Sequence, residues 1–330
     1  MLFKGQSLGK YRILSMLGSG GFGTVYLALD TWIDKKVALK VPHRQSLDFG
    51  ELLHEPRLLA SVNHPNIVAI TTAEKQDNLF FIVMEYVQGE TLEAIIARAG
   101  ALEVPQVLDY TVQICNAIDH AHRQGVIHRD LRPANVLVSE AGVCKVADFG
   151  TSRFLEIAAH GTTVIGSPPY MAPEQFHGKA VFASDVYSLG VTMYQMLTGE
   201  LPYEAPAPGD LDKLTSGELV TPLRVRRPGV PKRLADIVAT AMAPDLTQRY
   251  QRAADLLADL LTLQAPARTP PAARTEPATA TGSRVTLDPP PPDLASRLRP
   301  RETPAPRFCW QCRKPLHART DRCPFCGETQ

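Results

Sequence analysis

Short apolar runs in the first 90 residues alternate with turn residues and predict a small region rich in strands. The runs contain β-branched and aromatic side chains, which are enriched in strands. Strands are predicted at residues 11–14, 25–28, 36–40 and 79–84, and one helical pattern at residues 52–61 lies between them. This part of the chain is therefore expected to be a small sheet accompanied by one helix.

The spacing of apolar residues becomes helical from about Leu92 onward. Between Val107 and Ala121 the apolar residues recur three and four positions apart, so one face of a helix would be buried. Two more apolar helices are predicted, at residues 183–197 and 252–263. A strand-rich part followed by a larger helical part predicts an α+β domain with two lobes.

The helical spacing ends after Leu263, and the composition changes with it. Residues 264–306 are dominated by Pro, Ala, Thr and Arg and include four consecutive prolines. Such a segment buries too little apolar surface to offset its conformational entropy, so we expect a disordered, partly polyproline linker. A spacer is the simplest role, and a docking site for a polyproline-binding domain is the alternative.

Composition and charge exclude several classes of protein. With 35 basic and 34 acidic side chains in 330 residues, the chain lacks the basic excess of a protein that binds nucleic acid over its whole surface. No run approaches the roughly 20 apolar residues of a membrane span, and the first residues lack the pattern of a signal peptide. We therefore expect a cytoplasmic protein, with Cys115 and Cys144 as ordinary core residues.

A glycine-rich turn follows the first predicted strand. Residues 18–23 read GSGGFG, and the next residues, Thr24, Val25 and Tyr26, favour a strand. A dinucleotide-binding fold would instead open a helix at the last glycine. The glycines are thus predicted at a hairpin tip, where backbone N–H groups without neighbouring Cβ atoms can approach phosphate oxygens.

Lys40 ends the strand predicted at residues 36–40, seventeen residues after Gly23. A lysine at the end of an apolar strand is usually a surface residue. Because this one follows the glycine-rich turn, we expect it to bind phosphate groups. Glu55, on the helix predicted at 52–61, is the candidate carboxylate that would orient the lysine.

Two further short motifs, each unremarkable alone, identify a family when their order and spacing are considered together. Residues 128–135 read HRDLRPAN, and residues 148–150, thirteen positions after Asn135, read DFG. With the preceding turn and lysine, they resemble the eukaryotic-type (Hanks-type) protein serine/threonine kinase family, especially its bacterial members, over roughly 250 residues. The resemblance implies a two-lobed protein kinase fold over residues 11–263 and transfer of the ATP γ-phosphate to protein hydroxyl groups.

The resemblance implies roles for individual residues. Asp130 would be the catalytic base or at least the group that orients the attacking hydroxyl; because a carboxylate is a weak base toward an alcohol, orientation is its expected main role. Asn135 and Asp148 would ligate Mg²⁺ or Mn²⁺ through oxygen atoms. Lys40, its partner Glu55 and Arg132 complete the expected catalytic set. The nucleotide would contact Leu17, Gly18, Ser19, Gly20, Gly21, Phe22, Gly23, Val25, Ala38, Lys40, Glu85, Val87, Asn135, Leu137 and Asp148, with Met84 as gatekeeper.

The segment at residues 166–174 (GSPPYMAPE) resembles the substrate-docking loop of serine/threonine kinases rather than that of tyrosine kinases. By the same resemblance, Glu174 would pair with Arg249, and Asp185 would brace the catalytic loop. Arg129, next to Asp130, is typical of kinases that are activated by phosphorylation of a loop, because arginine pairs with phosphate. The favoured phosphorylation sites are Thr162 and Thr163, ahead of Thr151, Ser152 and Ser167.

Two residues depart from the family pattern. Arg132 occupies the position of a lysine that contacts the γ-phosphate, and its planar fork is not equivalent to an ammonium group. Pro56 follows Glu55 directly and would remove a backbone donor inside a helix. We expect the protein to remain active with arginine at position 132. We expect pairing of Lys40 with Glu55 to depend on an activating event.

Four cysteines in the last 22 residues predict a separate small unit at residues 307–330. Two CxxC pairs, ten residues apart, can supply the four thiolates of a structural zinc site, as in a zinc ribbon. The expected ligands are Cys309, Cys312, Cys323 and Cys326. A redox dithiol is the alternative. Docking to a protein is favoured over binding to nucleic acid as the role of this unit.

The leading hypothesis is a protein serine/threonine kinase that acts on protein substrates and phosphorylates its own activation loop. The rival is a pseudokinase scaffold that binds partners, and nucleotide as well, without phosphoryl transfer. A third hypothesis makes the zinc unit a nucleic-acid adaptor, which salt-sensitive binding of residues 307–330 to DNA or RNA would support.

Overall fold

The computed structural model describes residues 2–21, 23–43, 62–76, 78–149, 167–204, 210–264, 307–308 and 315–316. The chain divides into two compact units, Met1–Arg268 and Thr269–Gln330. In the second unit, the described residues form two short antiparallel strands, β10 (Arg307–Phe308) and β11 (Pro315–Leu316). The helix predicted at residues 52–61 lies outside the described residues.

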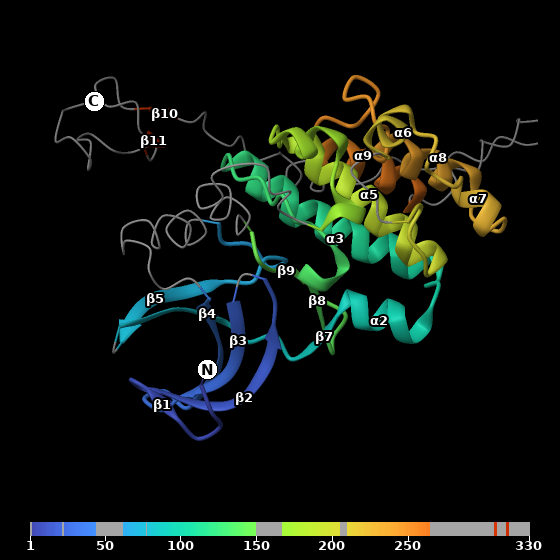
Figure 1. Ribbon diagram of the computed structural model, residues 1–330. Coiled ribbons are helices and arrows are strands. Elements are labelled where there is room, and N and C mark those ends of the chain that lie inside the picture. Colours follow the sequence, from blue (N-terminus) through green and yellow to red (C-terminus); the bar gives the residue numbers. More distant parts are fainter. Residues whose placement is uncertain are drawn as a thin grey trace, which may run out of the picture. The chain divides into compact units, whose positions relative to one another are not determined.

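A six-stranded antiparallel sheet forms the first lobe of the larger unit (Figure 1). Its strands are β1 (Ser7–Leu8), β2 (Tyr11–Ser19), β3 (Gly23–Asp30), β4 (Lys35–Pro42), β5 (Ile70–Gln76) and β6 (Leu79–Glu85), in the order β1-β2-β3-β4-β6-β5. The four strands predicted from apolar runs are confirmed as parts of β2, β3, β4 and β6. Strand β5 was not predicted because its sequence, ITTAEKQ, is largely polar and no residue in it is fully buried.

Helices make up most of the second lobe. They are α2 (Leu92–Ala99), α3 (Val104–Arg123), α5 (Phe182–Thr198), α6 (Leu211–Ser216), α7 (Leu223–Arg226), α8 (Lys232–Ala241) and α9 (Ala253–Gln264). The predicted helices at 183–197 and 252–263 are confirmed as α5 and α9. Helix α5 ends because Gly199 adopts a left-handed conformation with φ of 78°, which glycine tolerates without strain.

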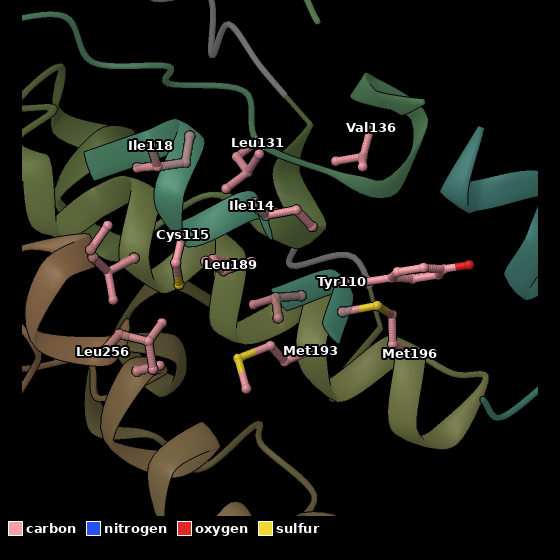
Figure 2. Packing of buried hydrophobic residues seen from close by; sticks show 14 of the residues in the cluster. Tyr110, Ile114, Cys115, Ile118, Leu131, Val136, Leu189, Met193, Met196 and Leu256 are labelled. Carbon is pink, nitrogen blue, oxygen red and sulfur yellow. The ribbon is translucent and has the colours of Figure 1, made fainter. Parts of the chain in front are cut away.

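The buried faces of α3, α5 and α9 share one hydrophobic core (Figure 2). The apolar face predicted between Val107 and Ala121 lies in this core, where Ile114 and Ile118 of α3 are fully buried with Leu189 of α5. Cys115 lies in the same layer, and burial raises the pKa of its thiol well above the ordinary range. The prediction that Cys115 is a core residue is confirmed.

Several short elements accompany the helices and carry polar residues that the sequence analysis named, such as Asn135 and Glu174. The strands β7 (Gly89–Thr91), β8 (Val136–Ser139) and β9 (Cys144–Val146) form a small antiparallel sheet. Three 3₁₀ turns accompany them: η1 (Pro133–Asn135), η2 (Pro168–Tyr170) and η3 (Pro173–His177). Across the described part of the chain, every helix is too short or too polar to cross a membrane.

Candidate active site

The glycine-rich turn lies at the tip of the β2–β3 hairpin. Ser19 pairs with Thr24 across the two strands, and the backbone N–H of Gly20 donates to the carbonyl oxygen of Gly23 at 3.0 Å. A strand, not a helix, follows the last glycine. A Cβ atom at Gly23 would lie 2.5 Å from the carbonyl oxygen of Val41, so β4 leaves room only for glycine at this position. Phe22 lies outside the described residues.

Lys40 lies on β4 with its side chain 8% exposed. Its Nζ donates to Oδ1 of Asp148 at 2.7 Å. Burial of the Asp148 carboxyl opposes its ionisation, but the positive charge of Lys40 and the hydrogen bond that it donates hold the pKa of Asp148 below its ordinary value. The expected partner of Lys40, Glu55, lies outside the described residues together with Pro56.

Asp130 lies in the loop before η1 and is 8% exposed. The side-chain amide of Asn135 donates through Nδ2 to the carbonyl oxygen of Asp130 at 2.7 Å and to its carboxylate Oδ2 at 3.1 Å. The backbone N–H of Ala147 donates to the carbonyl oxygen of Asn135 at 2.8 Å. These bonds place Asp130, Asn135 and the neighbouring Asp148 in one connected polar cluster, which Lys40 joins from the sheet.

Asp185 holds the backbone of the loop that carries Asp130. Its two carboxylate oxygens accept from the backbone N–H groups of His128 and Arg129, both at 2.8 Å. Arg129 has a positive φ of 69°, a costly conformation for a residue with a Cβ, which these bonds stabilise. A third bond to Asp185, at 2.9 Å, comes from Nε2 of the buried His122 on α3.

Two histidines in this network were given no role by the sequence analysis: His122 was not named, and His128 was named only as the first residue of the HRDLRPAN string. His122 lies four positions after Ile118 on the buried face of α3, and a polar residue at such a position was the available signal. Nε2 of His128 donates to the carbonyl oxygen of Ala147 at 2.9 Å, and the His128 ring packs against Phe149. His128 thus connects the catalytic loop to the segment that carries Asp148.

Arg132, just before η1, reaches two partners from different parts of the chain. Its Nη1 donates to Oγ of Ser167 at 2.6 Å, and its Nη2 donates to Oε1 of Glu93 on α2 at 3.0 Å. The guanidinium carbon also lies 5.9 Å from the ring centre of Tyr170 on η2. In this structure the arginine therefore contacts the first residues of the segment that was predicted to dock substrate.

The other end of that segment is held by a buried ion pair. Arg249 donates to both carboxylate oxygens of Glu174, at 2.8 and 3.2 Å, as the sequence predicted. Ser184 of α5 donates to the same carboxylate at 2.6 Å. Gln175 of η3 donates to the carbonyl oxygen of Arg129 at 2.9 Å, so this segment also contacts the catalytic loop.

The residues expected around adenine lie on the sheet and on β8. Ala38 of β4 lies opposite Met84 of β6, and Val25 of β3 lies opposite Lys40. Leu17 belongs to β2 and Leu137 to β8. Glu85 is the last residue of β6, the strand that carries Met84, and Val87 lies two residues beyond its end. The side chain of Glu85 accepts from Lys145 at 3.0 Å.

The described residues include a donor set that fits Mg²⁺. Nδ2 of Asn135 donates to Asp130, which leaves the side-chain amide oxygen, Oδ1, as the atom that can bind a metal ion. With a carboxylate of Asp148 it offers the hard oxygen ligands that Mg²⁺ prefers. Within the ranges described, no group of three or more His, Cys, Asp and Glu side chains could hold a metal.

The predicted phosphorylation sites before Ser167 and the predicted zinc ligands lie outside the described ranges: Thr151, Ser152, Thr162, Thr163, Cys309, Cys312, Cys323 and Cys326.

Comparison with known proteins gives concordant matches. Residues 11–274 match the family model described as a protein kinase domain. The chain is 36% identical over 270 residues to "Serine/threonine-protein kinase PrkC" of Bacillus subtilis (strain 168), which covers 79% of this chain and 42% of the relative. It is 35% identical over 265 residues to "Serine/threonine-protein kinase PknB" of Mycobacterium tuberculosis (strain ATCC 25177 / H37Ra), covering 76% and 42%.

A solved structure is similar as well. The crystal structure of Rad53 1-466 in complex with AMP-PNP has a TM-score of 0.65 and 26% sequence identity, over 75% of this chain and 64% of that chain. The chain spans about two fifths of the length of the curated relatives that it matches.

Proposed function

This chain belongs to the protein kinase family, and from that membership we propose that it is an ATP-dependent protein serine/threonine kinase. The observation that carries the proposal is the polar cluster of Lys40, Asp148, Asn135 and Asp130. Hydrogen bonds bring these four residues together from the sheet, the catalytic loop and the segment after β9. Phosphoryl transfer depends on positioning and charge neutralisation, which a lysine, two oxygen ligands and a carboxylate supply.

Each residue of the cluster has a proposed task. Lys40, held by Asp148, binds the phosphates beneath the glycine-rich hairpin. Asp148 and the amide oxygen of Asn135 hold Mg²⁺ or Mn²⁺, which neutralises phosphate charge when it is bound. Asp130 orients the hydroxyl group of the substrate, and the hydrogen bond from Asn135 to its Oδ2 keeps the carboxylate in place. Nucleotide binding is supported by the structural relative, which is in complex with AMP-PNP, and adenine is proposed to lie at Ala38, Met84 and Leu137.

Serine or threonine is the proposed acceptor. The names of the similar bacterial proteins support this class. The hydroxyl of Ser167, at the start of the docking segment, accepts from Arg132 and so lies beside the catalytic loop. Protein substrates would bind along Ser167–Glu174, and phosphorylation of Thr162 or Thr163 would regulate access to this segment.

We propose three parts for the chain: a kinase domain at residues 11–263, a disordered linker at 264–306 and a structural zinc unit at 307–330. The support for zinc is the spacing of Cys309, Cys312, Cys323 and Cys326. The proposed setting is the cytoplasm, where thiols remain reduced and available to a metal. Docking of a protein partner to the zinc unit or to the linker belongs to the same proposal. One zinc per chain by elemental analysis, lost in a variant with Cys323→Ser and Cys326→Ser, would support it.

The deciding experiment measures transfer of labelled γ-phosphate from Mg·ATP to the protein itself and to a generic basic protein. We expect label on serine or threonine with the wild type and a loss of at least about 100-fold in Asp130→Asn. Asp109→Asn, an exposed aspartate on α3, is the matched control and should retain the rate. A folded, nucleotide-binding wild type without any transfer would replace the kinase proposal with the pseudokinase scaffold.

A further inference from the structure

Glu93 is held in a defined place near the catalytic loop. It lies in the first turn of α2, whose N-terminus is capped by Thr91: the Thr91 hydroxyl accepts from the backbone N–H of Ala94 at 3.1 Å. Thr91 also pairs with Leu137 of β8, the strand that follows η1 (Figure 1). Leu92 is fully buried, so the start of α2 is fixed both by the core and by the small sheet.

The guanidinium of Arg132 is shared between Glu93 and Ser167. One terminal nitrogen donates to each partner, at 3.0 and 2.6 Å respectively. A guanidinium presents its donors in a rigid plane, so fixing one nitrogen also fixes the direction of the other. An ammonium group is a single point charge and does not transmit direction in this way.

We propose that Glu93 is a positioning residue for protein substrates, and this inference depends on the proposed kinase function. By holding one side of the Arg132 fork, Glu93 aims the other side at Ser167 and keeps the start of the docking segment beside Asp130. Among the contacts described, Glu93 reaches the substrate site through Arg132. Its loss therefore weakens substrate binding and leaves the nucleotide contacts unchanged.

The neighbouring pair Glu90–Arg98 shows what an ordinary surface contact looks like in the same region. Both of its side chains are about half exposed or more, at 48% and 63%, and Arg98 is the last-turn residue of α2. Glu93 is as exposed as Glu90, at 51%, so the difference lies in the arginine: Arg132 is only 29% exposed, and its Nε is buried without a hydrogen-bond partner among the described residues. In the contacts described, two hydrogen bonds and the ring of Tyr170 orient Arg132, whereas Arg98 touches no residue of the loop that carries Asp130.

Steady-state kinetics with a peptide substrate test the proposal. Glu93→Gln keeps the shape and removes the charge, and we expect the peptide KM to rise about 5-fold while the KM for ATP stays within about 1.5-fold. Glu90→Gln is the matched control and should change neither constant. Equal kinetics in the two variants, with equal melting temperatures, would overturn the proposal.

A double-mutant cycle distinguishes positioning through Arg132 from a general effect on folding. In an Arg132→Lys background the substitution Glu93→Gln should have no further effect on the peptide KM, because the fork that it orients is gone. If the two effects simply multiply, Glu93 does not act through Arg132.

Amide hydrogen exchange over residues 167–175 reports the same contact without turnover. We expect faster exchange in Glu93→Gln than in Glu90→Gln, because Arg132 is no longer held toward Ser167. Unchanged exchange would contradict the positioning role, even if the protein proved to be inactive. If the wild type is inactive but exchange in residues 167–175 still increases in Glu93→Gln, the kinase function is rejected and the contact between Glu93, Arg132 and this segment is supported.

Discussion

Two arginines hold opposite ends of the docking segment, and they do so under very different conditions. Arg249 is 0% exposed in its side chain, pairs with both oxygens of Glu174 and donates to the carbonyl oxygens of Ala183, Ala243 and Pro244. Arg132 is 29% exposed and has two side-chain partners, Glu93 and Ser167. The first contact belongs to the core of the helical lobe, and the second lies beside the proposed reaction.

The two arginine contacts therefore support different properties: that of Arg249 supports folding, and that of Arg132 supports the proposed function. A buried arginine without its carboxylate would be an uncompensated charge, so the Arg249–Glu174 contact has to form whenever the lobe folds. Arg132, at 29% exposure, keeps part of its hydration, so its contacts contribute less to folding than those of Arg249. The segment is thus anchored at Glu174 by folding energy, whereas its Ser167 end can respond to ligands and substrates.

The largest expected effect is on stability, from Arg249→Ala. Removing this side chain leaves Glu174 buried without its partner, and we expect a loss of about 3–5 kcal/mol in the free energy of unfolding. Urea denaturation followed by circular dichroism measures it. The control is Arg123→Ala, an exposed partner of Asp119 on α3, which should cost less than about 1 kcal/mol. Similar losses in both variants would show that the Arg249–Glu174 contact contributes no more to folding than an exposed ion pair does.

Asp185→Asn should weaken both folding and phosphoryl transfer. The carboxylate accepts three hydrogen bonds, from His122, His128 and Arg129, and an amide offers only one acceptor oxygen. We expect a loss of about 2–3 kcal/mol in stability, because bonds to a charged group are lost. At a temperature where the variant remains folded, the phosphoryl transfer rate should still fall, because the backbone around Asp130 is released. An unchanged rate would show that the brace serves stability alone.

Arg132→Lys should affect substrate binding and hardly touch stability. We expect less than about 1 kcal/mol in the free energy of unfolding, since the contact is partly exposed. The peptide KM should rise several-fold, while a cation remains beside Ser167 and transfer itself persists. Denaturation and steady-state kinetics on one preparation measure both. A loss of stability as large as that of Arg249→Ala would show that both arginines contribute to folding to the same extent.

The smallest effect concerns alkaline pH, where the two ends should behave alike. Burial raises the pKa of Tyr170, beside Arg132, to about 12, and burial raises the pKa of Tyr187, beneath Arg249, to about 12 as well. A raised pKa means that the unfolded chain releases its proton first, so stability present below about pH 10 is lost as the pH rises toward 12. Tyr170→Phe and Tyr187→Phe should each flatten that decline in urea midpoints between pH 9 and 11. A flatter decline in only one of them would reveal a difference in burial between the two sites.

Much of the fold and of the site could be predicted because the signals are local. Apolar runs marked β2, β3, β4 and β6, and three- and four-residue spacing marked the buried face of α3. Strand β5 escaped because its polar residues take strand geometry from pairing with β6. The dyad of His122 and Asp185 escaped for a related reason: its members lie 63 residues apart, and only helix packing joins them.

The sequence by itself determined the residue types of the site and their order along the chain. The glycine-rich turn, Lys40, the HRDLRPAN string and the DFG string are sufficient for the family, since phosphate and metal chemistry require these groups. Tertiary structure decided which groups touch. Arg132 could have faced solvent, Asp130 or a phosphate, and the place of α2 beside η1 directs it to Glu93 and Ser167. Such choices depend on contacts between distant segments, which no local pattern in the chain records.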